Sequence, residues 1–347
     1  MVNKQKNNIT LKSSWEFFKS WFSYFNLKKS TRISAEKPKD LITWVIHGFS
    51  EVIGTILLSL FLAGLSTVIK LVKAKPVVIE EYLIHPALVG FFAGFIAVGI
   101  VLFIFLRWSC DLNPSVTLTR YLNGTNDGWY ASFKIFMQFI GALLAGLIIY
   151  AVGKSQVGQD FVANMPINSI SAADKVFAPF KNSSVDTKLI TGSIWIVFVE
   201  LSITTILLVP IFSPRIEGKY RDTFIMAIIS FSVWMGILGG TAAINPARGL
   251  AQQLPILMFE NSNTQGFQAY THNLLGNLEN NATSYAWNGV VSGTISMLIG
   301  TFIAPLFYIF LQGFTEKVFN PFVVKVIGFK NYKAKNMIKP SMNDKNK

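Results

Sequence analysis

Six long apolar stretches constrain this chain more than any other feature of its sequence. They cover about residues 41–69, 86–107, 131–153, 190–212, 223–241 and 286–313. Because a helix rises about 1.5 Å per residue, each stretch is long enough to cross a hydrocarbon core about 30 Å thick. Only 14% of the 347 residues are charged, whereas ordinary soluble domains carry about 25%. The sequence therefore predicts an all-α integral membrane protein with six transmembrane helices.

The basic residues lie beside these apolar stretches. Residues 1–40 hold nine Lys and Arg, and residues 316–347 hold eight lysines. Six spans place both termini on one side of the membrane. The two terminal segments and the loop after the fourth span, all on that side, hold 20 Lys and Arg, while the opposite loops hold seven. The positive-inside rule then predicts cytoplasmic termini, in the cell membrane. Anionic lipid headgroups account for the net charge of +13, so no nucleic acid partner is expected.

Charge and hydropathy divide the chain into three parts. In the basic segment 1–40, aromatic residues are interleaved with lysines, which is typical of an amphipathic helix at the membrane interface. The membrane domain covers 41–315, with halves at about 41–153 and 190–313. A basic cytoplasmic tail covers 316–347.

Three polar segments carry little structural signal. The loops 154–189 and 254–285 are long for a compact bundle, so they are either functional or disordered. The tail is expected to be disordered after Asn331, because lysine and asparagine dominate there. One cysteine and three widely separated histidines provide no disulfide and no metal-ligand cluster. No nucleophile–base pair or phosphate loop is visible either, so we expect neither enzyme activity nor a cofactor.

Two short segments do not fit a pattern of six simple spans. Residues 110–120 follow the second span and residues 239–250 follow the fifth, and each contains Asn-Pro. Asn is a preferred N-cap, and Pro is favoured at the first helical position. A helix that starts at membrane depth leaves orphan N–H groups, which are tolerated only where they are buried in protein or line a cavity. We therefore expect two half-helices that enter from opposite faces and meet around a cavity.

The two halves of the chain also resemble each other. Glu51 lies in the first span and Glu200 in the fourth, each followed by similar apolar residues. With three spans in each half, the second copy must be inverted in the membrane. Such an inverted repeat places the functional site at the midplane.

These residues resemble the major intrinsic protein family, which comprises the aquaporins and glycerol facilitators. Typical members have Asn-Pro-Ala and then Val-Thr in the first half, and Asn-Pro-Ala-Arg in the second. This chain has Asn113-Pro114-Ser115-Val116-Thr117 and Asn245-Pro246-Ala247-Arg248. Gln138 in the third span and Pro305 in the sixth also match the family. The resemblance implies a right-handed bundle of six helices and two half-helices, usually a homotetramer with one pore in each subunit.

The resemblance also implies roles for individual residues. Asn113 and Asn245 would donate hydrogen bonds to the permeating molecule, and Arg248 would line the outer constriction. A cation in the first turn of a helix faces the positive end of its dipole, so Arg248 is expected to have a specific task. With the two dipole ends it would repel protons and cations. The structural supports would be Glu51, Glu200 and Gln138.

Counting from the two asparagines places three more residues at the constriction, namely Ala93, Val233 and Ala242. A register error of one residue would place Phe92 or Trp234 there instead. With the first set, the constriction is wide and apolar except for Arg248, which suits a small polyol.

Two positions depart from the family pattern. Gly249 stands where glycerol facilitators tend to have Asp and water-selective members Ser, so the usual marker of the substrate is absent. Asp111 stands where the family often has His. An anion suits a helix N-terminus, so Asp111 is interpreted either as a local cap or as an acidic group in the cytoplasmic vestibule.

The favoured function is a passive channel for glycerol and other small neutral solutes together with water, which excludes ions and protons. A water-selective pore, a coupled secondary transporter with broken helices and a non-transporting adhesion or junction protein are the alternatives. Against coupling, no carboxylate within the membrane is left over once Glu51 and Glu200 are assigned. The expected partners are small polyols, water, the lipid bilayer and further copies of the chain.

Overall fold

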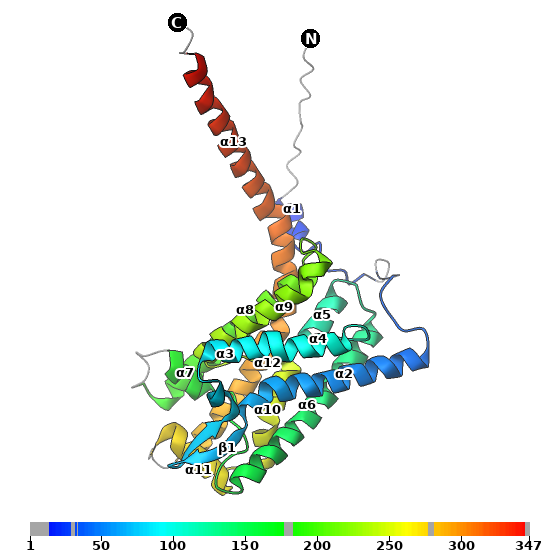
Figure 1. The fold of residues 1–347 in the computed structure, drawn as a ribbon. Coiled ribbons are helices and arrows are strands. Elements are labelled where there is room, and N and C mark those ends of the chain that lie inside the picture. Colours follow the sequence, from blue (N-terminus) through cyan, green and yellow to red (C-terminus); the bar gives the residue numbers. More distant parts are fainter. Residues whose placement is uncertain (1–13, 29–31, 33, 177–182, 277–280, 344–347) are drawn as a thin grey trace.

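A computed structural model describes the chain except for residues 1–13, 29–31, 33, 177–182, 277–280 and 344–347 (Figure 1). In the described part, six helical segments are long and apolar enough to cross a membrane. They are α2 (Leu41–Leu62), the continuous run of α3 (Pro86–Phe91), η4 (Phe92–Val98) and α4 (Gly99–Phe105), then α6 (Gly128–Val157), α8 (Val185–Phe212), α9 (Gly218–Gly239) and α12 (Ala282–Phe314). The predicted all-α membrane fold is confirmed.

The first span ends earlier than predicted. After α2 comes a short 3-10 turn, η2 (Ala63–Ser66), and then the antiparallel strands β1 (Val68–Val72) and β2 (Lys75–Val78). The two residues between the strands, Lys73 and Ala74, both have positive φ, as a tight hairpin turn requires. Hydropathy could not separate this strand from the end of a helix, because short apolar runs look alike in both.

The two Asn-Pro segments form half-helices, α5 (Pro114–Leu122) and α10 (Pro246–Phe259). Asn113 caps α5 by accepting a hydrogen bond from the Ser115 N–H at 2.9 Å. Asn245 caps α10 in the same way through the Ala247 N–H, also at 2.9 Å. Since α5 follows the second span and α10 follows the fifth, the half-helices run from the middle of the bundle towards opposite sides.

Helix packing repeats between the two halves. Helix α2 packs against α6 in the first half, and α8 packs against α12 in the second. Both half-helices contact α6 as well as α12, so they lie between the two halves. The second span packs closely on α9, where a Cβ added at Gly94 would lie 2.1 Å from the Met226 carbonyl oxygen. Only glycine fits at this crossing, as small residues do between membrane helices.

Both termini lie at the same end of the bundle, which we call the termini side, and the other end is the loop side (Figure 1). Here α1 (Ser14–Ser20) is followed by Trp21, whose ring lies 5.2 Å from that of Phe314 on α12. Helix α12 continues through η6 (Thr315–Phe319) into α13 (Asn320–Asn343), which stands clear of the bundle. The expected disorder after Asn331 is therefore wrong, because the backbone remains helical to Asn343.

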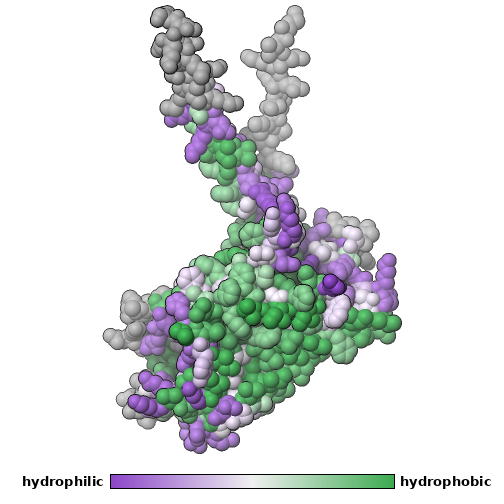
Figure 2. Space-filling view, in the orientation of Figure 1, coloured by the Kyte–Doolittle hydropathy of each residue, from purple (hydrophilic) through white to green (hydrophobic). Residues whose placement is uncertain are grey.

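The loop side carries short elements over the bundle, namely η3 (Ile79–Leu83), α7 (Ser169–Val176) and α11 (Gln265–Leu275). Helix α11 belongs to a cluster of buried residues that includes Val68, Phe161, Phe267, Tyr270 and Val290. Element η3 packs on a second cluster and α7 on a third. Thus the described parts of both long loops are packed, not disordered. Figure 2 shows that the visible flank of the bundle is largely hydrophobic, as contact with lipid tails requires, with hydrophilic residues towards its ends.

Candidate functional site

A cavity of about 520 Å³ lies along the half-helices. On the loop side its lining includes Glu80 and Lys175, and on the termini side Arg221 and Asp222. Asn113 and Asn245 line it between these ends. The residues that line the cavity therefore come from both sides of the bundle and from its centre.

The two asparagines are linked reciprocally across the centre. The side-chain nitrogen of Asn113 donates to the carbonyl of Ile244 at 3.3 Å, and that of Asn245 donates to the carbonyl of Leu112 at 2.7 Å. Each amide group has two N–H donors, so one hydrogen of each remains for a further acceptor. Both helix N-termini also direct their positive dipole ends here. The centre can thus donate hydrogen bonds to a molecule in the cavity and disfavours a cation.

Two buried glutamates hold the backbone ahead of the half-helices. The Glu51 carboxylate accepts the N–H of Leu112 at 2.8 Å and the N–H of Asp111 at 3.1 Å. The Glu200 carboxylate accepts the N–H of Ile244 at 2.8 Å, the N–H of Ala243 at 2.7 Å and the hydroxyl of Thr241. Both glutamates are fully buried. The two carboxylates thus make equivalent contacts ahead of the two half-helices.

The backbone that these glutamates hold is strained. Leu112 has a φ of 49° and Ile244 a φ of 62°, and residues other than glycine rarely adopt such positive values. Such residues cost about 1–3 kcal/mol each and persist only where the surroundings enforce them. Here the bonds to Glu51 and Glu200 enforce them, and the carbonyls that result accept from the opposite asparagine. The strain therefore serves the arrangement at the centre.

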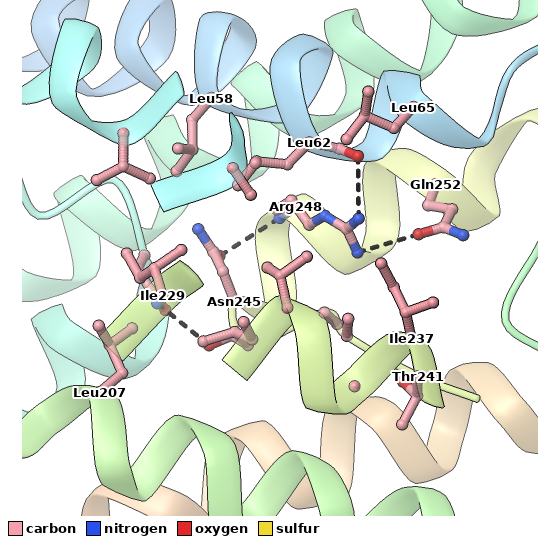
Figure 3. A pocket seen from close by; sticks show the side chains of 18 of the residues that line it. Leu58, Leu62, Leu65, Leu207, Ile229, Ile237, Thr241, Asn245, Arg248 and Gln252 are labelled. Atoms are coloured by element: carbon pink, nitrogen blue, oxygen red, sulfur yellow. Dashed lines mark hydrogen bonds between the residues drawn. The ribbon is translucent and has the colours of Figure 1, made fainter. Parts of the chain in front are cut away.

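Arg248 lies in the first turn of α10 and lines the cavity. Its guanidinium donates to the Leu62 carbonyl at 3.1 Å and to the Gln252 side chain at 3.0 Å, as Figure 3 shows. Its Nε is buried and has no hydrogen-bond partner within the described residues. The two hydrogen bonds therefore hold this cation in place on the cavity wall.

The other residues predicted at the constriction also line the cavity, namely Ala93, Val233 and Ala242. Neither Phe92 nor Trp234, the alternatives with shifted register, is among the lining residues of the described chain. Aliphatic side chains complete this part of the wall, including Leu58, Leu62, Leu65, Ile229 and Ile237, several of which surround Arg248 in Figure 3. The cavity is therefore apolar opposite its arginine.

Gly249 has a packing explanation. A Cβ at this position would lie 2.6 Å from the sulfur of Met297 on α12 and 2.9 Å from the Cβ of Ala243. Met297 is fully buried and occupies the space that a side chain at 249 would need. The missing marker of the substrate is thus replaced by a side chain from another helix.

Restoring a side chain at this position is expected to succeed only with a smaller neighbour. We expect Gly249→Asp to destabilise the protein by about 1–3 kcal/mol, as overpacking usually does. Gly249→Asp combined with Met297→Ala should recover part of that loss, because the collision is removed. Thermal unfolding in detergent measures both. Equal melting temperatures for the single and double variants would contradict this account.

Asp111 lies in a network that the sequence did not suggest. One carboxylate oxygen accepts from Arg120 Nε at 2.8 Å, and the other contacts Lys134 Nζ at 2.6 Å. The cap interpretation is wrong, because Asn113 caps α5. Asp111 does line the cavity, but with two cations against it. Lys134 lies at the start of the predicted span 131–153, where a charge within an apolar stretch is itself a sign of a specific role.

Part of the loop 154–189 forms the cavity wall, which the sequence did not indicate. Gln253 on α10 accepts the Ile167 N–H at 2.7 Å and donates to the Ile167 carbonyl at 3.0 Å. Gln252 donates to the Met165 carbonyl at 2.9 Å. These bonds fix residues 165–168 along the cavity. This part of the loop therefore completes the cavity wall beside Arg248.

Charged residues also stand where the cavity opens on the loop side. Glu80 and Glu81 of η3 and Lys175 of α7 line it there. Burial raises the pKa of Glu80, while Lys175 and Arg248 oppose this shift. No group of three or more His, Cys, Asp or Glu that could hold a metal ion occurs among the described residues.

Comparison with known proteins gives one family match. The family model described as "Major intrinsic protein" matches residues 41–264. Among solved structures, the chain is similar to the X-ray structure of the aquaglyceroporin from Plasmodium falciparum, with 19% sequence identity and a TM-score of 0.45. That match covers 81% of this chain and 98% of the other. No curated protein matches.

Proposed function

Because the chain belongs to the major intrinsic protein family, a family of membrane channels for water and small solutes, we propose that it conducts glycerol and similar small neutral molecules together with water. We further propose that it excludes ions and protons. The observation that carries the choice of solute is that the cavity lined by Arg248 has an aliphatic part of its wall, which includes Ala93, Val233 and Ile237.

This wall suits a small polyol for a simple reason. A polyol has a carbon backbone on one side and hydroxyl groups on the other. The backbone loses little when it leaves water for an apolar surface beside Ala93 and Val233. The oxygen of a hydroxyl group can accept hydrogen bonds from the N–H groups of Arg248 and the two asparagines. The hydrogen of the same group can be donated to a backbone carbonyl of the cavity wall. A water-selective pore would not need this apolar face.

Exclusion of ions is expected from the same residues. Arg248 and the N-termini of α5 and α10 all present positive charge to the cavity. Positive half-helix ends and an arginine are a known means of excluding protons and cations from such pores. Asn113 and Asn245 would bind neutral molecules transiently at the centre of the pore by donating hydrogen bonds to them.

We propose that the protein lies in the cell membrane with its termini side in the cytoplasm, as the distribution of Lys and Arg indicates. We also propose that it assembles as a homotetramer. Mass measurement of the purified protein in detergent or nanodiscs tests the second point, and a monomer under all conditions would contradict it.

The decisive experiment measures swelling of proteoliposomes by stopped-flow light scattering. We expect rapid swelling in iso-osmotic glycerol without any ion gradient, and slower entry of longer polyols. Rapid water flux without glycerol flux would favour the water-selective alternative. A requirement for sodium or a proton gradient would favour a coupled transporter, and loss of both fluxes with an intact fold would favour an adhesion protein.

Narrowing the constriction should separate the two permeants. We expect the double substitution Ala93→Phe and Val233→Phe to lower the ratio of glycerol to water permeability at least about tenfold, because a steric penalty near 1.4 kcal/mol is enough for that. Trp234→Phe, next to Val233 but outside the cavity lining, is the matched control and should leave the ratio unchanged. An unchanged ratio in the double variant would place the constriction elsewhere.

A further inference from the structure

The strongest feature outside the expected pore residues is the charge cluster behind the first half-helix. Lys134 Nζ lies 2.6 Å from Asp111 and 3.6 Å from Glu51, and Arg120 Nε lies 2.8 Å from Asp111. The side chains of Lys134, Asp111 and Glu51 are at most 5% exposed. Two carboxylates and two cations thus share one site, in which the Arg120 side chain is 32% exposed, and their formal charges cancel.

The four charges do not stand equally towards the cavity. Asp111 and Arg120 line it, whereas Lys134 and Glu51 are not among the lining residues. Lys134 therefore meets Asp111 from behind the wall. Thr117 donates to the same Asp111 oxygen at 3.0 Å and accepts from Gln138 at 3.0 Å, which fixes the carboxylate in place. An acidic group faces the solute path, and a buried lysine that solutes do not touch compensates it.

Among the described residues, the second half of the bundle has no such cluster. The salt bridges in the described part of the chain include none with Glu200. Ala243, two residues before Asn245, stands where Asp111 stands before Asn113. The paired cations are therefore not needed to hold a half-helix. The two cations occur only in the half that has the extra carboxylate, Asp111. We therefore expect them to act on the charge of that carboxylate.

We propose that Lys134 cancels the charge of Asp111 and so keeps the termini side of the pore from admitting cations. This inference rests on the proposed function, because it concerns ion exclusion by the same channel. Without Lys134, the cluster would carry one net negative charge beside the cavity. A unit charge at close range in a protein concentrates counter-ions strongly, by about tenfold or more. Arg221 and Asp222 at the same mouth are of opposite sign and leave the balance unchanged.

The test compares cation leak in proteoliposomes that hold a sodium-sensitive dye, with glycerol swelling measured on the same preparations. We expect Lys134→Met to swell in glycerol but to leak sodium at least about tenfold faster than the natural protein. Lys134→Arg keeps the charge and should not leak. Lys134→Met combined with Asp111→Asn removes both charges and should also not leak, which a merely structural role for Lys134 would not produce.

Two results would overturn the proposal. One is a Lys134→Met channel that conducts glycerol without added leak, and the other is a double variant that leaks as the single variant does. If Lys134→Met does not fold, Arg120→Gln gives the cluster the same net charge of −1 and can be tested instead. Sodium leak through Arg120→Gln would support the proposal, and a leak no faster than in the natural protein would contradict it. Absence of glycerol flux in the natural protein would instead refute the proposed function, which this design reports separately.

Discussion

Replacing Arg248 with valine is expected to abolish proton exclusion. Proteoliposomes with the natural protein should keep an imposed pH gradient, whereas those with Arg248→Val should lose it more than about tenfold faster. The reason is electrostatic, since a unit charge about 8 Å away contributes about 2 kcal/mol at an effective dielectric constant of 20. Arg248 lines the same cavity as Ala93 and Val233, and its guanidinium is fixed by Leu62 and Gln252.

Two controls make this result specific. Arg248→Lys keeps the charge and should keep most of the exclusion, although it cannot make both hydrogen bonds in the same geometry. Gln252→Leu removes one partner of the guanidinium and leaves the charge in place. A pH-sensitive dye inside the vesicles gives the rates, and glycerol swelling shows that each variant is folded. If the pH gradient decayed at the same rate with Arg248→Val as with the natural protein, this role for Arg248 would be excluded.

Replacing Glu200 with leucine is expected to destroy the fold of the second half-helix. Three donors would lose their acceptor, namely the Thr241 hydroxyl and the N–H groups of Ala243 and Ile244. Each buried donor left without a partner costs about 1–3 kcal/mol. Ile244 would also lose the contact that holds its positive φ. We expect a melting temperature about 10 °C lower in detergent, with loss of solute flux.

Matched substitutions separate this effect from a general loss of packing. Glu200→Gln keeps one acceptor oxygen and should lie between Glu200→Leu and the natural protein. Phe198→Leu, two residues away and largely exposed on the flank of the same helix, should change neither stability nor flux. If Glu200→Leu melted within about 2 °C of the natural protein, the backbone before α10 would not depend on Glu200 for its conformation.

The sequence predicted the features of this fold that depend on local pattern. Hydropathy located the six spans to within a few residues, apart from the hairpin after α2. The two Asn-Pro pairs located the half-helices, because capping chemistry is written in neighbouring residues. The two glutamates were found because a carboxylate in an apolar stretch is costly and conspicuous. Lys134 lies within the predicted span 131–153, and the same argument applies to its charge.

Other parts of the site could not be predicted, because they depend on pairs of residues far apart in the chain. Ile167 belongs to a polar loop with no distinctive motif, and only its contacts with Gln253 place it on the cavity wall. Met297 fills the space beside Gly249 from another helix. Local propensity and periodicity carry no information about such long-range neighbours.

The reciprocal bonds between the asparagines have a consequence for how the molecule is made. Asn113 is completed by Ile244 and Asn245 by Leu112, across separations of 131 and 133 residues. During synthesis on the ribosome, the first half leaves the tunnel and enters the bilayer while its partner residues do not yet exist. Its central loop must therefore wait, with Leu112 unsupported from the far side, until the last spans are inserted. The pore is finished in a single late step that joins the two halves.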